Sequence, residues 1–196
     1  MSVILASKSA ARRALLSGAG VTHEADVAGV DEEAVKTTLL ADGATPRDVA
    51  DALAELKAIK VSAKRSGLVI GADQTLDLDG TLYDKTETLE AARERLMALR
   101  GKTHKLHSAV VVAKDGAPIW RELATASLTM RDFSDAFLDE YLATEGDQAL
   151  GSVGCYRLEG PGAQLFSKIE GDYFAILGLP LLGLLDLLRR HGELRT

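Results

Sequence analysis

An aspartate at the end of a buried strand is the first residue whose position suggests chemistry. Asp73 follows the hydrophobic run Leu68–Ile70 and two residues with almost no side chain, Gly71 and Ala72. Where a sheet ends, such small residues let a ligand approach the backbone closely, and a carboxylate there faces a crevice. A capped turn is the purely structural interpretation of the same residue. Asp73 is therefore a candidate functional carboxylate.

A second set of groups, suited to phosphate oxygens, lies in the segment "ASKSAAR" near the start of the chain. Ser7 and Ser9 contribute hydroxyls, and the start of the predicted helix contributes backbone N–H groups and the positive end of its dipole. Arg12 follows one turn into the helix, and Lys57 and Lys85 are further cations. Each has an ordinary alternative, because Ser9 also suits a helix cap and Arg12 a solvated helix surface.

Carboxylates that accompany these cations indicate a divalent metal. Asp31, Glu32 and Glu33 occur in "GVDEEAV", and Asp73 is a further candidate ligand. Mg²⁺ is ordinarily held by one or two protein carboxylates together with substrate phosphates. Spacing along the chain leaves open whether these groups converge.

The sequence "DLDGTL" has a competing interpretation, because it is spelled like the phosphatase motif of the haloacid dehalogenase superfamily. In that interpretation Asp77 is the nucleophile and Asp79 the acid. The chemistry also needs a downstream acidic pair for Mg²⁺, and the segments "GDQALG" and "GDYFAI" both lack the second aspartate. Asp79-Gly80 is a strong two-residue hairpin turn, which favours both aspartates as solvent-facing turn and strand residues.

Short apolar runs that alternate with amphipathic stretches of helical period predict an α/β domain that positions these groups. Strands are expected over 2–6, 68–70 and 163–171, with a hairpin over 106–130 that turns at Asp115-Gly116. Helices are expected over 9–20, from Pro46 onward, over 88–101, after Ser134 and from Pro180 onward. The 196 residues, 46% of them apolar, suit one domain that covers 1–196.

Charge and cysteine content exclude several classes of protein. The net charge is −6 and the basic residues form no run, so polymeric nucleic acid is not an expected partner. Cys155 is the single cysteine, which rules out an internal disulfide framework and favours a small packing residue. The start "MSVILA" is too short for a signal peptide, and no apolar run reaches the length of a membrane span. We therefore expect a cytoplasmic protein without a membrane partner.

Several motifs occur in the order found in the Maf family of nucleoside triphosphate pyrophosphatases, which the chain resembles along nearly its whole length. They are "LASKSAARRALL", "VDE" at 30–32, "LAELKA", "IGADQ", "LDLDGTLYDK", "LRGKTH" and the tail "LEGPGAQLFSKIEGDYFAILGLPLLGLL". In this resemblance Asp73 occupies the position of the family's catalytic acid-base residue. The aspartates of "DLDGTL" correspond to the family's hairpin turn.

The resemblance implies a fold, a reaction and a cofactor. The fold is a single elongated α/β domain with a central mixed sheet flanked by helices and a cleft between two lobes, similar to inosine triphosphate pyrophosphatases. The reaction is hydrolysis between the α and β phosphates of a nucleoside triphosphate with Mg²⁺ or Mn²⁺. Asp73 then binds the metal and orients or deprotonates water, and Glu32 helps to hold the metal. The triphosphate is assigned to Ser7, Ser9, Arg12 and the catalytic cations Lys57 and Lys85.

Three positions bear on the base of the substrate. Gln74 and Glu159 are similar to the branch of the family that acts on 7-methyl-GTP, whereas the branch that prefers dTTP and UTP tends to carry Thr and Gln. A glutamate accepts hydrogen bonds from a guanine edge, and its charge favours a cationic methylated base. Ala11 matches neither the arginine nor the tryptophan of the two branches. The preferred base therefore stays open.

Two other functions remain beside a pyrophosphatase. A dehalogenase-type phosphatase would depend on Asp77. A non-catalytic nucleotide-binding regulator of cell division would bind triphosphates without hydrolysing them, and the combination of Asp73 with Lys57 and Lys85 argues against it. The family resemblance further implies a homodimer and leaves the cellular role open between nucleotide house-cleaning and cell division.

Overall fold

The computed structural model describes residues 2–195 and contains a mixed sheet of seven strands in the order β2-β1-β3-β5-β6-β7, with β4 paired to β3. β1 pairs in parallel with β2 and β3, whereas β3 pairs antiparallel with β4 and β5, and β6 with β5 and β7. The strands are β1 (Val3–Leu5), β2 (Glu24–Ala25), β3 (Leu68–Leu78), β4 (Thr81–Tyr83), β5 (Thr103–Lys114), β6 (Ala117–Met130) and β7 (Phe166–Glu170). The predicted α/β fold with a mixed sheet is confirmed.

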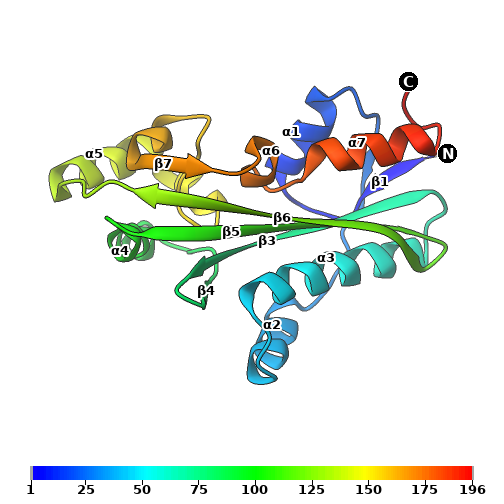
Figure 1. Ribbon diagram of the computed structural model, residues 1–196, viewed down its shortest axis with the longest axis horizontal. Helices are drawn as coiled ribbons and strands as arrows, with labels where there is room; N and C mark the ends of the chain where they lie inside the picture. Colours follow the sequence, from blue (N-terminus) through cyan, green and yellow to red (C-terminus); the bar gives the residue numbers. More distant parts are fainter. Residues whose placement is uncertain (1, 196) are drawn as a thin grey trace.

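Helices cover both faces of the long central strands in the elongated molecule (Figure 1). α3 lies along one face, α1, α6 and α7 lie on the other, and α4 and α5 lie at the end that carries β7. The helices are α1 (Ala10–Gly18), α2 (Glu32–Ala41), α3 (Pro46–Ser62), α4 (Leu89–Leu99), α5 (Asp135–Glu145), α6 (Tyr173–Ile176) and α7 (Leu181–Arg190). None of the helices in residues 2–195 is long and apolar enough to cross a membrane.

Local sequence signals explain where the predicted helices begin. Ser9 accepts a hydrogen bond from the backbone of Arg12 at the start of α1, and Thr45 forms a reciprocal capping box with Asp48 at the start of α3. At the start of α5, the Ser134 side chain accepts a hydrogen bond from the backbone N–H of Phe137. These predicted starts are confirmed because a cap depends only on residues within one turn.

The two hairpin turns also follow from local chemistry. Asp79 and Gly80 have φ of 54° and 84°, and Asp115 and Gly116 have φ of 51° and 80°. Both pairs therefore have the positive φ at each central residue that a tight two-residue hairpin requires. The Asp77 carboxylate accepts a hydrogen bond from the Gly80 N–H at 2.7 Å, which closes the first turn.

Three expectations about elements need correction. The strand predicted over 68–70 continues to Leu78, so Asp73 lies within β3 and not at its end: pairing with β1 ends at Ile70, but pairing with β5 continues and includes Asp73 with Ala109. The strand predicted over 163–171 begins only at Phe166, because Pro161–Leu165 forms a short 3₁₀ helix that starts at the proline. α2 was not predicted from the carboxylates in "GVDEEAV", yet Asp31 caps it and Glu32 and Glu33 form its first turn. α2 has no buried residue, so its pattern carries no apolar stripe that would mark a helix.

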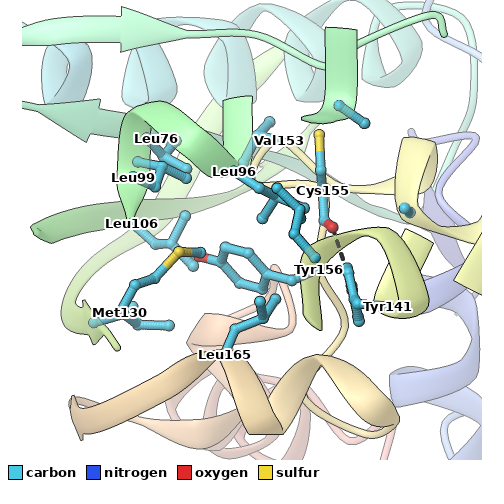
Figure 2. Close-up of a cluster of buried hydrophobic side chains, with 14 of the residues drawn as sticks. Leu76, Leu96, Leu99, Leu106, Met130, Tyr141, Val153, Cys155, Tyr156 and Leu165 are labelled. Carbon is cyan, nitrogen blue, oxygen red and sulfur yellow. Dashed lines mark hydrogen bonds between the residues drawn. The ribbon is translucent and has the colours of Figure 1, made fainter. Parts of the chain in front are cut away.

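The hydrophobic core is divided between the two ends of the sheet. At the end with α4 and α5, Figure 2 shows Leu96, Leu99, Leu106 and Met130 gathered near the ring of Tyr156. Side chains of β1, α1 and α7 form a separate cluster at the other end. Each end of the sheet therefore has a hydrophobic cluster of its own. Each fully buried leucine in these clusters contributes about 1.5–3 kcal/mol to folding.

Candidate active site

A cleft of about 860 Å³ borders the core cluster at the end with α4 and α5, and all ten predicted site residues line it. They come from the β1–α1 turn, α1, α2, α3, β3, the segment after β4 and the loop before the 3₁₀ helix Pro161–Leu165. These residues are Ser7, Ser9, Ala11, Arg12, Glu32, Lys57, Asp73, Gln74, Lys85 and Glu159. Groups far apart in the sequence therefore converge.

A buried ion pair forms the centre of this cleft. Lys57 Nζ on α3 lies 2.6 Å from Asp73 Oδ1 on β3 and 3.0 Å from Glu32 Oε1 at the start of α2. The side chains of Lys57 and Asp73 are only 8% and 10% exposed. One ammonium group thus holds two carboxylates next to each other.

Gly71 allows this contact between α3 and β3. A Cβ atom at position 71 would lie 2.1 Å from the Ala54 carbonyl oxygen and 2.5 Å from the Ala58 nitrogen. The helix can therefore rest directly on the strand only because this residue has no side chain. That close approach brings Lys57 within reach of Asp73 two residues farther along the strand.

Arg12 is fixed against the cleft wall by three hydrogen bonds. Its Nη1 donates to Ser7 Oγ at 3.2 Å and to the Ala72 carbonyl at 3.0 Å, and its Nε donates to the Gly178 carbonyl at 2.8 Å. The alternative that Arg12 is an ordinary solvated helix residue is wrong. The alternative for Ser9, a helix cap, is confirmed, and Ser9 also lines the cleft.

Burial and charge shift the pKa values of the central groups. Burial raises the pKa of Asp73, and the nearby charges of Lys57 and Arg12 oppose that shift. Burial also lowers the pKa of Lys85, and the positive charge of Arg12 acts in the same direction. Lys85 makes no hydrogen bond or ion pair with any residue in 2–195, so its ammonium group is available to a ligand.

Gln74 is oriented by its own hydrogen bonds. Its Nε2 donates to Ser108 Oγ at 2.8 Å and lies 3.1 Å and 3.0 Å from the carbonyl oxygens of Ala175 and Ile176 on α6. Two carbonyl acceptors require the amide nitrogen on that side. The amide oxygen is thereby left as the group that Gln74 can offer to a ligand.

The opposite end of the cleft is open and contains Glu159 and Ala11. Both are exposed, and the Glu159 carboxylate makes no hydrogen bond or ion pair with the described residues. A smaller apolar cavity of about 400 Å³ between α1, α6 and α7 adjoins this end and shares both residues with it. The short side chain of Ala11 therefore leaves the cleft connected to apolar space.

Sequence reasoning missed several residues of the cleft. Lys36 Nζ lies 2.6 Å from Asp84 Oδ2, and both residues line the cleft beside Lys85. Arg157 lines it as well. Recognition of α2 would have found Lys36, because it follows Glu32 by four residues and so lies on the same helix face.

The aspartates of the dehalogenase interpretation lie outside the cleft lining. Asp77 is four residues beyond Asp73, which is about 13 Å along a strand. One of its oxygens closes the hairpin turn, and the other lies 3.2 Å from Nε2 of the buried His107. Asp79 is exposed as predicted, but Asp77 is only 16% exposed, so the expectation of a solvent-facing side chain was wrong for it. Contact with β5 explains this burial.

A divalent metal fits the donors that are present. No group of three or more His, Cys, Asp and Glu side chains that could hold a metal ion occurs within residues 2–195. The two carboxylates that share the Lys57 ammonium, Asp73 and Glu32, do lie together in the cleft. One or two carboxylates suffice for Mg²⁺ when substrate phosphates complete its coordination.

These features describe an α/β protein with a cleft in which cations and carboxylates converge. Its sequence matches the family described as Maf-like protein over residues 2–191, and the chain belongs to this family. It is 65% identical over 192 residues to a protein of Caulobacter vibrioides named nucleoside triphosphate pyrophosphatase, which covers 98% of this chain and 96% of that protein. It is 53% identical to a protein of Brucella abortus named 7-methyl-GTP pyrophosphatase, with 96% of each chain covered. The predicted family is confirmed.

Proposed function

We propose that this protein is a nucleoside triphosphate pyrophosphatase that hydrolyses the bond between the α and β phosphates, giving a monophosphate and pyrophosphate. The observation that carries the proposal is the buried Lys57–Asp73 pair at the centre of a cleft that also contains Arg12 and Lys85. The names of the relatives in Caulobacter and Brucella support the same reaction.

In this proposal Asp73 orients water and accepts its proton. Burial raises the pKa of Asp73 and so makes the carboxylate a better base, while Lys57 keeps it ionised. Lys57, Lys85 and Arg12 then stabilise the negative charge that develops on the transferred and leaving oxygens. Ser7 and Ser9 donate hydrogen bonds to the phosphates from the β1–α1 turn.

We further propose that Asp73 and Glu32 hold Mg²⁺ or Mn²⁺ together with the triphosphate. When bound, the metal neutralises phosphate charge and lowers the pKa of a coordinated water. The residues of the chain provide the binding groups for it, and Lys57 holds both carboxylates in place from behind.

For the base, the proposal is a guanine, with 7-methylguanine as the first candidate. Gln74 offers its amide oxygen and Glu159 its carboxylate, so both groups accept hydrogen bonds. The Watson–Crick edge of guanine has N–H donors to match them, and the carboxylate charge also favours a cationic methylated ring. Ala11 gives the base additional room on the side of the apolar cavity.

We assign this function to one domain, residues 1–196, acting on a small nucleotide rather than on polymeric nucleic acid. A homodimer and a cytoplasmic location are the remaining parts of the proposal, and sedimentation analysis and cell fractionation test them. Nucleotide house-cleaning and cell division are the two roles to separate by deletion of the gene.

Product analysis tests the proposed reaction. The purified protein is incubated with Mg²⁺ or Mn²⁺ and GTP, 7-methyl-GTP, UTP or dTTP, and the products are separated by ion exchange. A monophosphate with pyrophosphate is the expected result. A diphosphate with inorganic phosphate, or inorganic phosphate released from monophosphates, would support a phosphatase. Tight binding without turnover would support the regulator.

A further inference from the structure

Glu145, the last residue of α5, is a buried carboxylate with no part in the site described above. Its side chain is only 3% exposed. Burial of a carboxylate is costly without a partner, and the negative end of the helix dipole at this position adds to the cost. A group that compensates this charge must therefore be close.

Arg157 is that partner, and it connects Glu145 to the cleft. Arg157 Nε donates to Glu145 Oε2 at 3.0 Å, while the Arg157 side chain is 35% exposed and lines the cleft. A Cβ atom at position 160 would lie 3.3 Å from Glu145 Oε1 and 3.4 Å from Arg157 Nη2, so Gly160 lets the loop close around the pair. Such a pair is weak evidence for a stabilising role, because apolar residues can often replace a buried ion pair without loss of stability.

The segment that closes around this pair also carries Glu159. Glu159 follows Arg157 by two residues, and the two side chains interact electrostatically across the loop. The Glu159 carboxylate nevertheless makes no ion pair with the described residues, whereas the Arg157 Nε donates to Glu145. Without the Glu145 carboxylate, the Arg157 guanidinium would be free to form an ion pair with Glu159 on the same loop.

A second contact from α5 holds the same loop. Tyr141 Oη donates to the Cys155 carbonyl at 3.1 Å, the bond drawn as a dashed line in Figure 2. Cys155 has φ of 58°, which is unusual for a residue with a side chain. α5 thus contacts the loop at Cys155 and again at Arg157, just before Glu159.

We propose that Glu145 is a positioning residue for base recognition: it holds Arg157 away from Glu159, so that the Glu159 carboxylate stays free to accept hydrogen bonds from the base. This inference rests on the proposed function, in which Glu159 contacts the base. It assigns the selectivity of the cleft partly to a helix that contributes no residue to the cleft lining.

The test compares Glu145→Gln with the double variant Glu145→Gln/Arg157→Gln. Selectivity is measured as the ratio of Kd values for the α,β-methylene analogues of UTP and GTP, by titration calorimetry with Mg²⁺. Turnover of GTP is measured separately. Glu145→Gln should lower the ratio about tenfold, since a factor of ten corresponds to about 1.4 kcal/mol of lost hydrogen bonding. The kcat of Glu145→Gln for GTP should stay within about twofold of the wild-type value, whereas its KM for GTP should rise.

The double variant separates positioning from a structural role. Removing both charges frees Glu159 again, so selectivity should return to within about threefold of the original ratio. Glu140→Gln changes an exposed carboxylate on the same helix and should have no effect. Thermal unfolding of each variant shows that it is folded at the assay temperature.

Three results would overturn the inference: a wild-type protein that does not prefer the guanine analogue, a folded Glu145→Gln variant with unchanged selectivity, or a double variant as unselective as the single one. Failure of the proposed function has a different signature. In that case the methylene analogues still bind with the expected pattern of ratios, but no pyrophosphate is released from any triphosphate.

Discussion

The two ends of the cleft are built in different ways. At the proposed phosphate end, Lys57 and Asp73 project from a long helix and a central strand and are at most 10% exposed. At the proposed base end, Glu159 projects from the loop between the 3₁₀ helices Gly146–Gly151 and Pro161–Leu165 and is exposed. The comparison teaches that the central ion pair of the cleft is set on rigid elements, whereas the carboxylate of Glu159 is set on a loop.

The charges at the two ends are also arranged differently. At the phosphate end, Lys57 joins two carboxylates, those of Asp73 and Glu32. At the base end, Glu159 makes no ion pair with any residue in 2–195, while Arg157 is bound to Glu145. A substitution at the phosphate end should therefore change the rate for every substrate, and one at the base end should change the choice among substrates.

Asp73→Asn should cause the largest effect. An amide cannot accept the proton from water, so kcat with every triphosphate should fall by about a thousandfold, within the range found for lost general bases. Pyrophosphate release measured under saturating substrate checks this. Asp77→Asn, on the same strand but outside the cleft, is the control and should stay within about twofold. A large loss in the control and none in Asp73→Asn would restore the dehalogenase interpretation.

Gly71→Ala should weaken the phosphate end through the fold. The added methyl group meets the backbone of α3 at 2.1 Å, so the helix must move away from β3 and separate Lys57 from Asp73. Overpacking of this kind costs about 1–3 kcal/mol in the free energy of unfolding. Urea unfolding and GTP turnover should both show a loss. Gly18→Ala is the matched control, because its new Cβ would meet no atom within 4 Å.

Glu159→Gln should affect the choice of base more than the rate. Replacement of the carboxylate removes a charge-assisted hydrogen bond, so preference for 7-methyl-GTP over UTP should fall about tenfold, mainly through KM. Steady-state kinetics with both nucleotides measure the ratio. An equal loss of kcat for both substrates would mean that Glu159 belongs functionally to the phosphate end.

The pH dependence should show the smallest effect. Activity should fall on the acid side as Asp73 is protonated, at a higher pH than for an ordinary aspartate, since burial raises its pKa. It should fall on the alkaline side as Lys85 loses its proton, at a lower pH than for an ordinary lysine, since burial lowers its pKa. The profile of kcat/KM measures both limits. Lys85→Arg should move only the alkaline one upward, and an unchanged alkaline limit would exclude Lys85 as its cause.

Much of the fold was predictable because its signals are local. Ser9 and Thr45 mark helix starts within one turn, and Asp79-Gly80 and Asp115-Gly116 mark hairpins by the positive φ that these residues tolerate. α2 was missed because it buries no residue and so lacks an apolar period. The start of β7 was misplaced because an apolar run does not reveal a 3₁₀ turn before it.

The sequence by itself indicated the family, the α/β class and ten of the residues that line the cleft, because ordered motifs and short-range caps and turns are visible along the chain. Only the tertiary structure decided what those residues touch. The tertiary structure directed the Gln74 amide nitrogen to two carbonyl oxygens of α6. It also placed Asp77 beside His107, where its side chain is partly buried, and Glu145 against Arg157. Such contacts join residues from separate elements, and their geometry depends on how helices and strands come together in space.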